Sequence, residues 1–182
     1  MKTLDMHKIR KQLVKALDSK RYEHTQGVAY TSAALAMRYG EDIQKAELAG
    51  LLHDCAKCLD NEKKIQICKK HNIEISEAEQ NNPFLLHAKV GGYLAKTKYK
   101  VDDEEIIDAI VYHTTGRPGM SLMEKIVYIA DYIEPGKKVG WDAYQVLNEQ
   151  GNYNLKFKIE TIDQTTYEPR NGATMDVIAI VE

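Results

Sequence analysis

The sequence lacks the marks of a membrane-spanning or nucleic-acid-coating protein. No stretch approaches the roughly 20 consecutive apolar residues that a transmembrane helix needs. The net charge is only -2, whereas proteins that coat nucleic acids are usually basic. We therefore expect neither a membrane nor a nucleic acid as a partner. With 43% hydrophobic and 29% charged residues in 182 positions, the chain has the composition of an ordinary folded domain.

Cysteine is also scarce, because the chain has only Cys55, Cys58 and Cys68. An odd number of cysteines, without an apolar run of signal-peptide length near the first residue, predicts reduced thiols in a cytoplasmic protein. The Cys55-x-x-Cys58 spacing would suit a zinc or redox pair. No second such pair and no βαβ pattern accompanies it, so we interpret both residues as small helix residues.

Residues 1–136 carry helix patterns one after another. The spacing of apolar residues predicts helices over 5–18, 21–38, 42–55, 61–71, 84–97 and 104–113, and a last helix from Ser121 to Pro135. Gly40 is suited to end a helix, and Ser76 followed by Glu79 has the spacing of a capping box. This part of the chain is therefore predicted to be an all-α helical bundle.

The pattern changes after Gly136. Residues 153–160 alternate apolar and polar side chains with a period of two, and residues 175–181 are apolar and β-branched. Turn-forming residues lie between these two segments. We therefore predict a separate appendage over 137–182, with a short β-hairpin-like structure.

Histidines and aspartates recur along the helical region, about one group per predicted helix. The set comprises His24, His53, Asp54, His87, His113 and Asp131. Each histidine alone is more often an ordinary surface or core residue, but helices in a bundle can direct such side chains to one interior point. His53 and Asp54 follow an apolar run, where burying them is costly without a compensating charge.

This ligand set predicts two metal ions. Six nitrogen and oxygen ligands exceed the four of a structural zinc site, and they suit Fe, Mn, Zn, Ni or Co. Paired metals can stabilise both the attacking and the leaving oxygen in phosphoryl transfer. The pattern therefore favours hydrolysis of a nucleotide phosphate ester or anhydride.

Basic and hydroxyl side chains flank the predicted ligands and suit phosphate oxygens. They are Arg21, Lys57, Lys89, Thr114, Thr115 and Arg117. Either lysine alone is more often a solvated surface residue, so the prediction rests on the grouping. We expect a small nucleotide as the substrate.

Four stretches resemble the YqeK family of HD-domain metal-dependent phosphohydrolases over roughly residues 20–136. They read RYEHTQGVAYTSAALA, KAELAGLLHDCAK, NNPFLLHAKVGGYLA and AIVYHTTGRPGMSLMEKIVYIADYIEP. The resemblance implies an all-α HD-domain bundle that hydrolyses diadenosine tetraphosphate symmetrically to two ADP. It also implies a two-metal centre, with iron as the first choice, and a homodimer. Residues 137–182 do not resemble the family.

The resemblance further implies a role for individual residues. One metal would be held by His24, His53, Asp54 and Asp131, and Asp54 would bridge to a second metal held by His87 and His113. Asp54 and Lys57 are the expected catalytic residues. Lys57, Thr115 and Arg117 would stabilise the phosphate charge.

Three alternatives stay open on the sequence alone. Another HD phosphohydrolase would act on a deoxynucleotide or guanosine tetraphosphate. A nucleotide sensor would bind ADP or a GDP-like nucleotide with little turnover. A metal-free helical interaction domain would keep its metal content unchanged when Asp54 is replaced by alanine.

Overall fold

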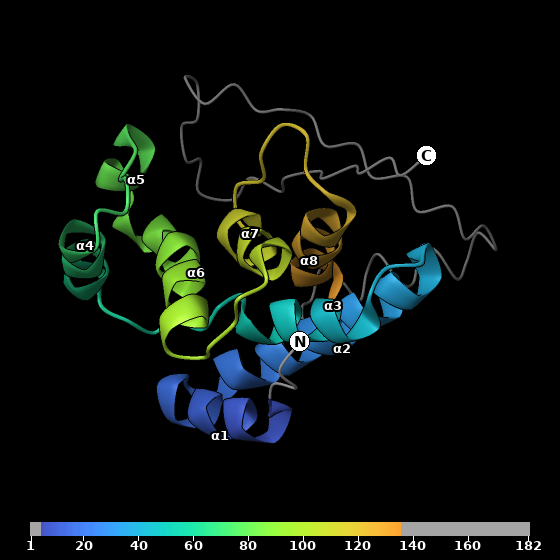
Figure 1. Ribbon diagram of the computed structural model, residues 1–182. Coiled ribbons are helices and arrows are strands. Elements are labelled where there is room, and N and C mark those ends of the chain that lie inside the picture. Colours follow the sequence, from blue (N-terminus) through green and yellow to red (C-terminus); the bar gives the residue numbers. More distant parts are fainter. Residues whose placement is uncertain (1–4, 136–182) are drawn as a thin grey trace. The chain divides into compact units, whose positions relative to one another are not determined.

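The computed structural model describes residues 5–135, and all regular structure in these residues is helical. In chain order the helices are α1 (Met6–Ala16), α2 (Ser19–Tyr39), α3 (Ile43–Leu52), α4 (Asn61–Lys70), α5 (Glu77–Asn81), the 3-10 helix η1 (Pro83–Leu86), α6 (His87–Thr97), α7 (Glu104–Tyr112) and α8 (Leu122–Ile133) (Figure 1). The predicted all-α class is confirmed for this part of the chain. The β-hairpin-like structure predicted for 137–182 lies outside the described residues.

Polar residues at the predicted positions begin and end several helices. The Asp18 side chain accepts a hydrogen bond from the Arg21 amide at 2.8 Å, which satisfies an amide without a helical partner. Ser76 and Glu79 form the predicted capping box of α5. Gly40 ends α2 with a φ of 78°, a left-handed conformation that glycine adopts without steric cost. Local sequence therefore determines where these helices stop.

The main core lies where α2, α3, α7 and α8 meet. Helix α2 packs along α3 and against α8, and α7 packs against α3, α6 and α8. Figure 1 shows α2 and α3 beneath α7 and α8, with α1 below them. Leu13, Leu52, Ile110 and Val127 are among the buried side chains of this core. Burying such apolar surface is the main source of stability for a bundle of this kind.

A smaller apolar cluster holds the other end of the described region. Ala56, Cys68, Leu86 and Val90 are buried together, and they join α4 and η1 to α6. In Figure 1, α4 and α5 lie to one side, beyond α6. This cluster fixes the short helix η1, which comes directly before His87.

Two predicted helices have different bounds in the structure. The helix predicted over 42–55 ends at Leu52, and tighter turns follow in which the Lys57 amide donates to the Asp54 carbonyl at 2.9 Å. The continuous helix predicted over 84–97 is divided, because η1 precedes α6. In both places a histidine side chain bonds a carbonyl three residues earlier, which competes with regular helical hydrogen bonding.

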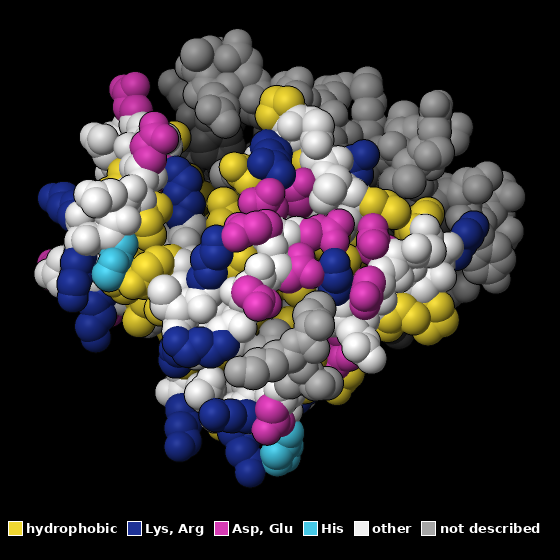
Figure 2. Space-filling model, in the orientation of Figure 1, with side chains coloured by type: hydrophobic (Ala, Val, Ile, Leu, Met, Phe, Trp, Pro, Cys, Tyr) yellow, Lys and Arg dark blue, Asp and Glu magenta, His cyan; other side chains and the backbone are white. Residues whose placement is uncertain are grey.

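The surface in Figure 2 mixes charges, with Asp and Glu side chains gathered over the middle of this face and Lys and Arg more often towards its edges. Little histidine appears on this face. None of the helices within residues 5–135 is long and apolar enough to cross a membrane.

Candidate metal centre

Five separate elements bring the predicted ligands to one place. The ligands are His24 on α2, His53 and Asp54 directly after α3, His87 at the start of α6, His113 directly after α7, and Asp131 on α8. Successive imidazole rings lie edge to face, with centroids 4.9–5.3 Å apart. These five elements therefore bring the six side chains together, as the sequence pattern predicts.

Three of the four histidines are oriented by the main chain in the same way. In each, Nδ1 contacts the carbonyl oxygen of the residue three positions earlier. These contacts are His53 to Gly50 at 2.7 Å, His87 to Phe84 at 2.6 Å and His113 to Ile110 at 2.7 Å. A carbonyl only accepts, so Nδ1 carries the proton and the lone pair of Nε2 faces the centre. This is the tautomer that a metal-ligating histidine needs.

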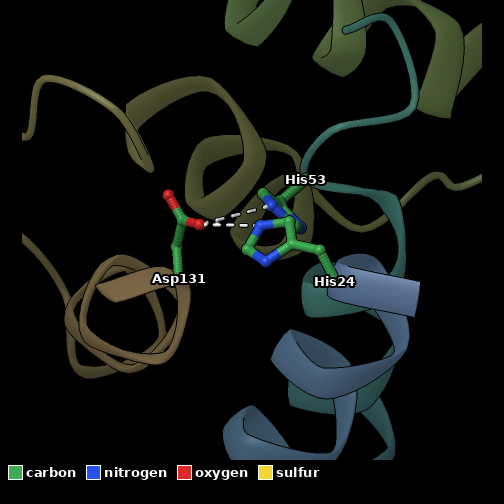
Figure 3. Close-up of side chains that lie close together, drawn as sticks. All are labelled: His24, His53 and Asp131. Carbon is green, nitrogen blue, oxygen red and sulfur yellow. Dashed lines mark ion pairs between the residues drawn. The ribbon is translucent and has the colours of Figure 1, made fainter. Parts of the chain in front are cut away.

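One half of the centre joins α2 to α8. Asp131 Oδ1 lies 3.0 Å from His24 Nε2 and 3.7 Å from His53 Nε2. Figure 3 shows both rings directed towards this carboxylate. The potential ligand atoms of the three residues all lie within 4.8 Å of one another, close enough to hold one metal ion.

The Asp54 carboxylate lies between the two halves of the centre. Its Oδ2 lies 3.5 Å from His53 Nε2, and its Oδ1 lies 3.2 Å from His87 Nε2 and 3.5 Å from His113 Nε2. His53, Asp54 and His113 form a second group with metal-binding spacing. One carboxylate can therefore offer a different oxygen to each half.

The burial of these polar atoms fits a bound cation. His53 and Asp54 are buried, and within residues 5–135 His53 Nε2 and Asp54 Oδ1 have no hydrogen-bond partner. Leaving such atoms unsatisfied is costly, and a metal ion would compensate for the loss of water.

The charge states of Asp54 and His113 suit a cation. Burial opposes the ionisation of Asp54, but the facing imidazoles of His53, His113 and His87 outweigh it and hold the pKa of this carboxyl well below its ordinary value. Burial lowers the pKa of His113, which keeps this ring neutral. For His53, burial is outweighed by Asp54 and Asp131, which raise its pKa, so a metal ion would have to compete with a proton for this ring. An ionised carboxylate and neutral imidazoles are the forms that bind metals.

Three of the predicted phosphate-binding residues contact the centre. Lys57 Nζ lies 3.1 Å from His87 Nε2 and 3.7 Å from Asp54 Oδ1. Arg21 donates to Asp54 Oδ2 at 2.8 Å. Thr114 Oγ1 lies 3.0 Å from His113 Nε2. Their basic and hydroxyl groups therefore border the metal ligands.

The other three predicted residues have contacts elsewhere. Lys89 pairs with Glu79 at 2.7 Å, on the side of α6 that faces α5. Arg117 Nε donates to the buried Glu124 at 2.7 Å. Thr115 Oγ1 bonds the carbonyl of the next residue at 3.3 Å. Among the described residues, no contact of these three with the predicted ligands is observed.

Glu134 is a neighbour of the centre that sequence reasoning missed. Its Oε1 lies 2.9 Å from His24 Nδ1, and its side chain is buried. Asp131 and Glu134 are three residues apart, a spacing that puts two side chains on one helical face. The spacing alone could have indicated that Glu134 lies on the same face as Asp131. Nothing in the sequence relates Glu134 to His24, which lies 110 positions earlier.

Comparison with known proteins assigns the fold family. Residues 21–136, more than half of the chain, match the HD domain. The chain belongs to the HD-domain family. HD domains bind divalent metals, and the described residues of this HD domain contain His and Asp groups that could hold them.

Two curated relatives of this HD domain carry the same name, bis(5'-nucleosyl)-tetraphosphatase, symmetrical. The protein from Bacillus subtilis is 48% identical over 66% of this chain and 64% of its own length, which is less than two thirds. That from Halalkalibacterium halodurans is 46% identical over 70% of this chain and 68% of its own length.

A solved structure has the same fold. The crystal structure of a predicted HD superfamily hydrolase involved in NAD metabolism, from Clostridium acetobutylicum, is 47% identical with a TM-score of 0.74. The match covers 80% of this chain and 78% of that chain.

Proposed function

We propose that the protein hydrolyses diadenosine tetraphosphate to two ADP at a centre that holds two divalent metal ions. His24, His53, Asp54 and Asp131 would hold one ion, and Asp54, His87 and His113 the other. The observation that carries the proposal is the position of Asp54, whose two oxygens face different histidines. The mixed nitrogen and oxygen ligands suit Fe, Mn, Ni, Co or Zn, and the family resemblance makes iron the first choice among them.

Metal ions at such a centre lower the pKa of water and neutralise phosphate charge. The protein contributes fixed ligands, because main-chain carbonyls orient His53, His87 and His113. In the overall reaction a water oxygen forms a bond to one of the two inner phosphorus atoms. The bond from that phosphorus to the central bridging oxygen breaks, ADP leaves, and water supplies its proton.

Lys57 and Arg21 are placed to stabilise the phosphates. Lys57 donates a hydrogen bond to His87 Nε2, whose lone pair a metal ion would occupy. With a metal ion bound to His87, the Lys57 ammonium group would be available to substrate oxygens. The Lys57 and Arg21 side chains are each 32% exposed, which leaves them accessible at the edge of a buried centre. Cations directed at developing phosphate charge are a main source of rate acceleration.

The relatives support this choice of substrate. Both curated relatives are named for symmetrical cleavage of bis(5'-nucleosyl) tetraphosphates, and the HD match spans the residues that carry all six proposed ligands. The three unpaired cysteines are compatible with the reducing cytoplasm, where we place the protein.

Product analysis tests the proposal. The full chain, freed of metal and then supplied with Mn²⁺ or Fe²⁺, is incubated with diadenosine tetraphosphate, and the nucleotides are separated by chromatography. We expect ADP as the sole product, and AMP with ATP, or no turnover, would contradict the proposal. Deoxynucleoside triphosphates and guanosine tetraphosphate in parallel reactions test the alternative substrates.

A further inference from the structure

His24 is the exception among the four histidines of the centre. The other three direct Nδ1 at a main-chain carbonyl, whereas His24 Nδ1 faces the Glu134 carboxylate at 2.9 Å. Its Nε2 faces Asp131 Oδ1 at 3.0 Å, on the side of the ring drawn in Figure 3. Asp131 and Glu134, which are three residues apart near the end of α8, thus contact opposite edges of the His24 imidazole ring.

Glu134 is itself held in a confined place. Its side chain is 3% exposed, although it lies just after the last residue of α8. Gly27 lies one helical turn after His24 on α2, and a Cβ atom at Gly27 would be 2.3 Å from Glu134 Oε2. A methyl group at this position would therefore displace the carboxylate.

Gly27 lowers the stability of the helix in which it lies. Gly27 lies in the interior of α2, where glycine is about 1 kcal/mol less favourable than alanine. Space for the Glu134 carboxylate is a physical reason for glycine here. Gly27, His24 and Glu134 thus form one packed unit between α2 and α8.

We propose that Glu134 is a positioning residue that orients His24 and strengthens its Nε2 as a metal ligand, and that Gly27 provides the space for it. This inference rests on the proposed metal centre. A carboxylate is a stronger acceptor than a carbonyl, and it makes the ligating nitrogen more electron-rich. The ion on the His24 side is consequently bound more tightly than the ion held by His87 and His113.

Metal titration of the full chain tests this inference without any substrate. Metal-free protein is titrated with Mn²⁺, and free ion is followed by electron paramagnetic resonance. We expect Glu134→Ala to weaken one of the two binding steps by about 10–100-fold and to leave the other unchanged. Glu134→Gln keeps an acceptor without the charge, so its loss should be intermediate.

Gly27→Ala provides an independent variant, because it leaves both His24 and Glu134 chemically intact. We expect the same binding step to weaken, and the Gly27→Ala/Glu134→Ala double variant to bind no worse than Glu134→Ala alone. Glu23→Gln is the matched control, because Glu23 is exposed on α2 beside His24. It should titrate like the unaltered chain.

Unchanged binding in Glu134→Ala, or an equal loss in both steps, would overturn the inference. Additive losses from Gly27→Ala and Glu134→Ala would also overturn it. Circular dichroism of each metal-free variant verifies folding, and Glu134→Gln carries the test if Glu134→Ala does not fold. The product pattern from diadenosine tetraphosphate has no influence on this readout, so failure of the proposed activity would be seen separately.

Discussion

His24 is held by the carboxylates of Asp131 on α8 and of Glu134 directly after it, whereas the histidines of the other half, His87 and His113, are held by main-chain carbonyls. His87 and His113 each bond a carbonyl three residues earlier, so their orientation is determined by a local turn. His24 instead depends on Glu134, which is distant in the sequence. The orientation of His87 and His113 is therefore insensitive to substitutions elsewhere in the chain. The orientation of His24 depends on the packing of distant residues, so substitutions at those residues can change it.

The largest expected effect comes from Asp54, which both halves share. Asp54→Asn removes the charge from the proposed bridge, so both ions should be bound more weakly and ADP release should fall by at least about a thousandfold. Metal content by mass spectrometry and ADP release measure the two effects. Asp60→Asn is the control, because Asp60 is exposed and its side chain makes no capping hydrogen bond. Full metal content in Asp54→Asn would contradict the bridging role.

Single-histidine variants separate the two halves. His24→Ala should lose the tighter ion and His87→Ala the weaker one, so each variant retains about one ion per chain at saturating Mn²⁺. Metal content after equilibrium dialysis is the measurement. If both variants lost both ions, the halves would form one cooperative site and the comparison would fail.

A variant of Lys57 tests whether the cation beside His87 acts on the substrate phosphates. Lys57→Ala should lower kcat/KM by about a hundredfold while metal content is unchanged, because a cation near the phosphates is lost. Lys63→Ala, at an exposed position of α4, is the matched control. An unaltered kcat/KM in Lys57→Ala would limit the role of Lys57 to pairing with Asp54 and His87.

Arg117 tests how the loop between His113 and α8 is stabilised. Arg117→Ala leaves the buried Glu124 without its cation, and we expect the melting temperature to fall by roughly 2–4 °C. Burial opposes ionisation of Glu124, but the Ser121 amide and Arg117 outweigh it and lower its pKa below the ordinary value of 4.5. The difference from the unaltered chain should thus be full above pH 4.5 and shrink as the pH falls through the lowered pKa. A pH-independent difference would contradict this assignment.

The smallest effect is expected for Lys89. The sequence pattern places this lysine among the phosphate-binding residues, whereas the structure pairs it with Glu79. Lys89→Ala should change kcat/KM by less than about twofold, because the Lys89 ammonium group is paired with Glu79 and contacts none of the proposed ligands among the described residues. A loss comparable to that of Lys57→Ala would instead support the prediction made from the sequence.

The helices, and the histidines and aspartates that converge at the centre, could be predicted because they depend on local periodicity and on residue type. Gly40 and Ser76 signal helix ends, and the histidines recur one per helix. Proximity in the sequence alone predicts that Arg117 and Lys89 bind phosphate, because their carboxylate partners, Glu124 and Glu79, become neighbours only in the folded chain. Glu134 was missed for the same reason, because its contact with His24 arises only when α2 and α8 pack.

Metal stoichiometry of the unaltered chain tests the central claim most directly. The metal-free chain is titrated with Mn²⁺ while bound ions and ADP release from diadenosine tetraphosphate are recorded together. We predict two ions per chain, bound in two separable steps, with ADP release appearing as the second ion binds. A single ion at saturation, or full ADP release in the absence of metal, would contradict a two-metal centre built around Asp54.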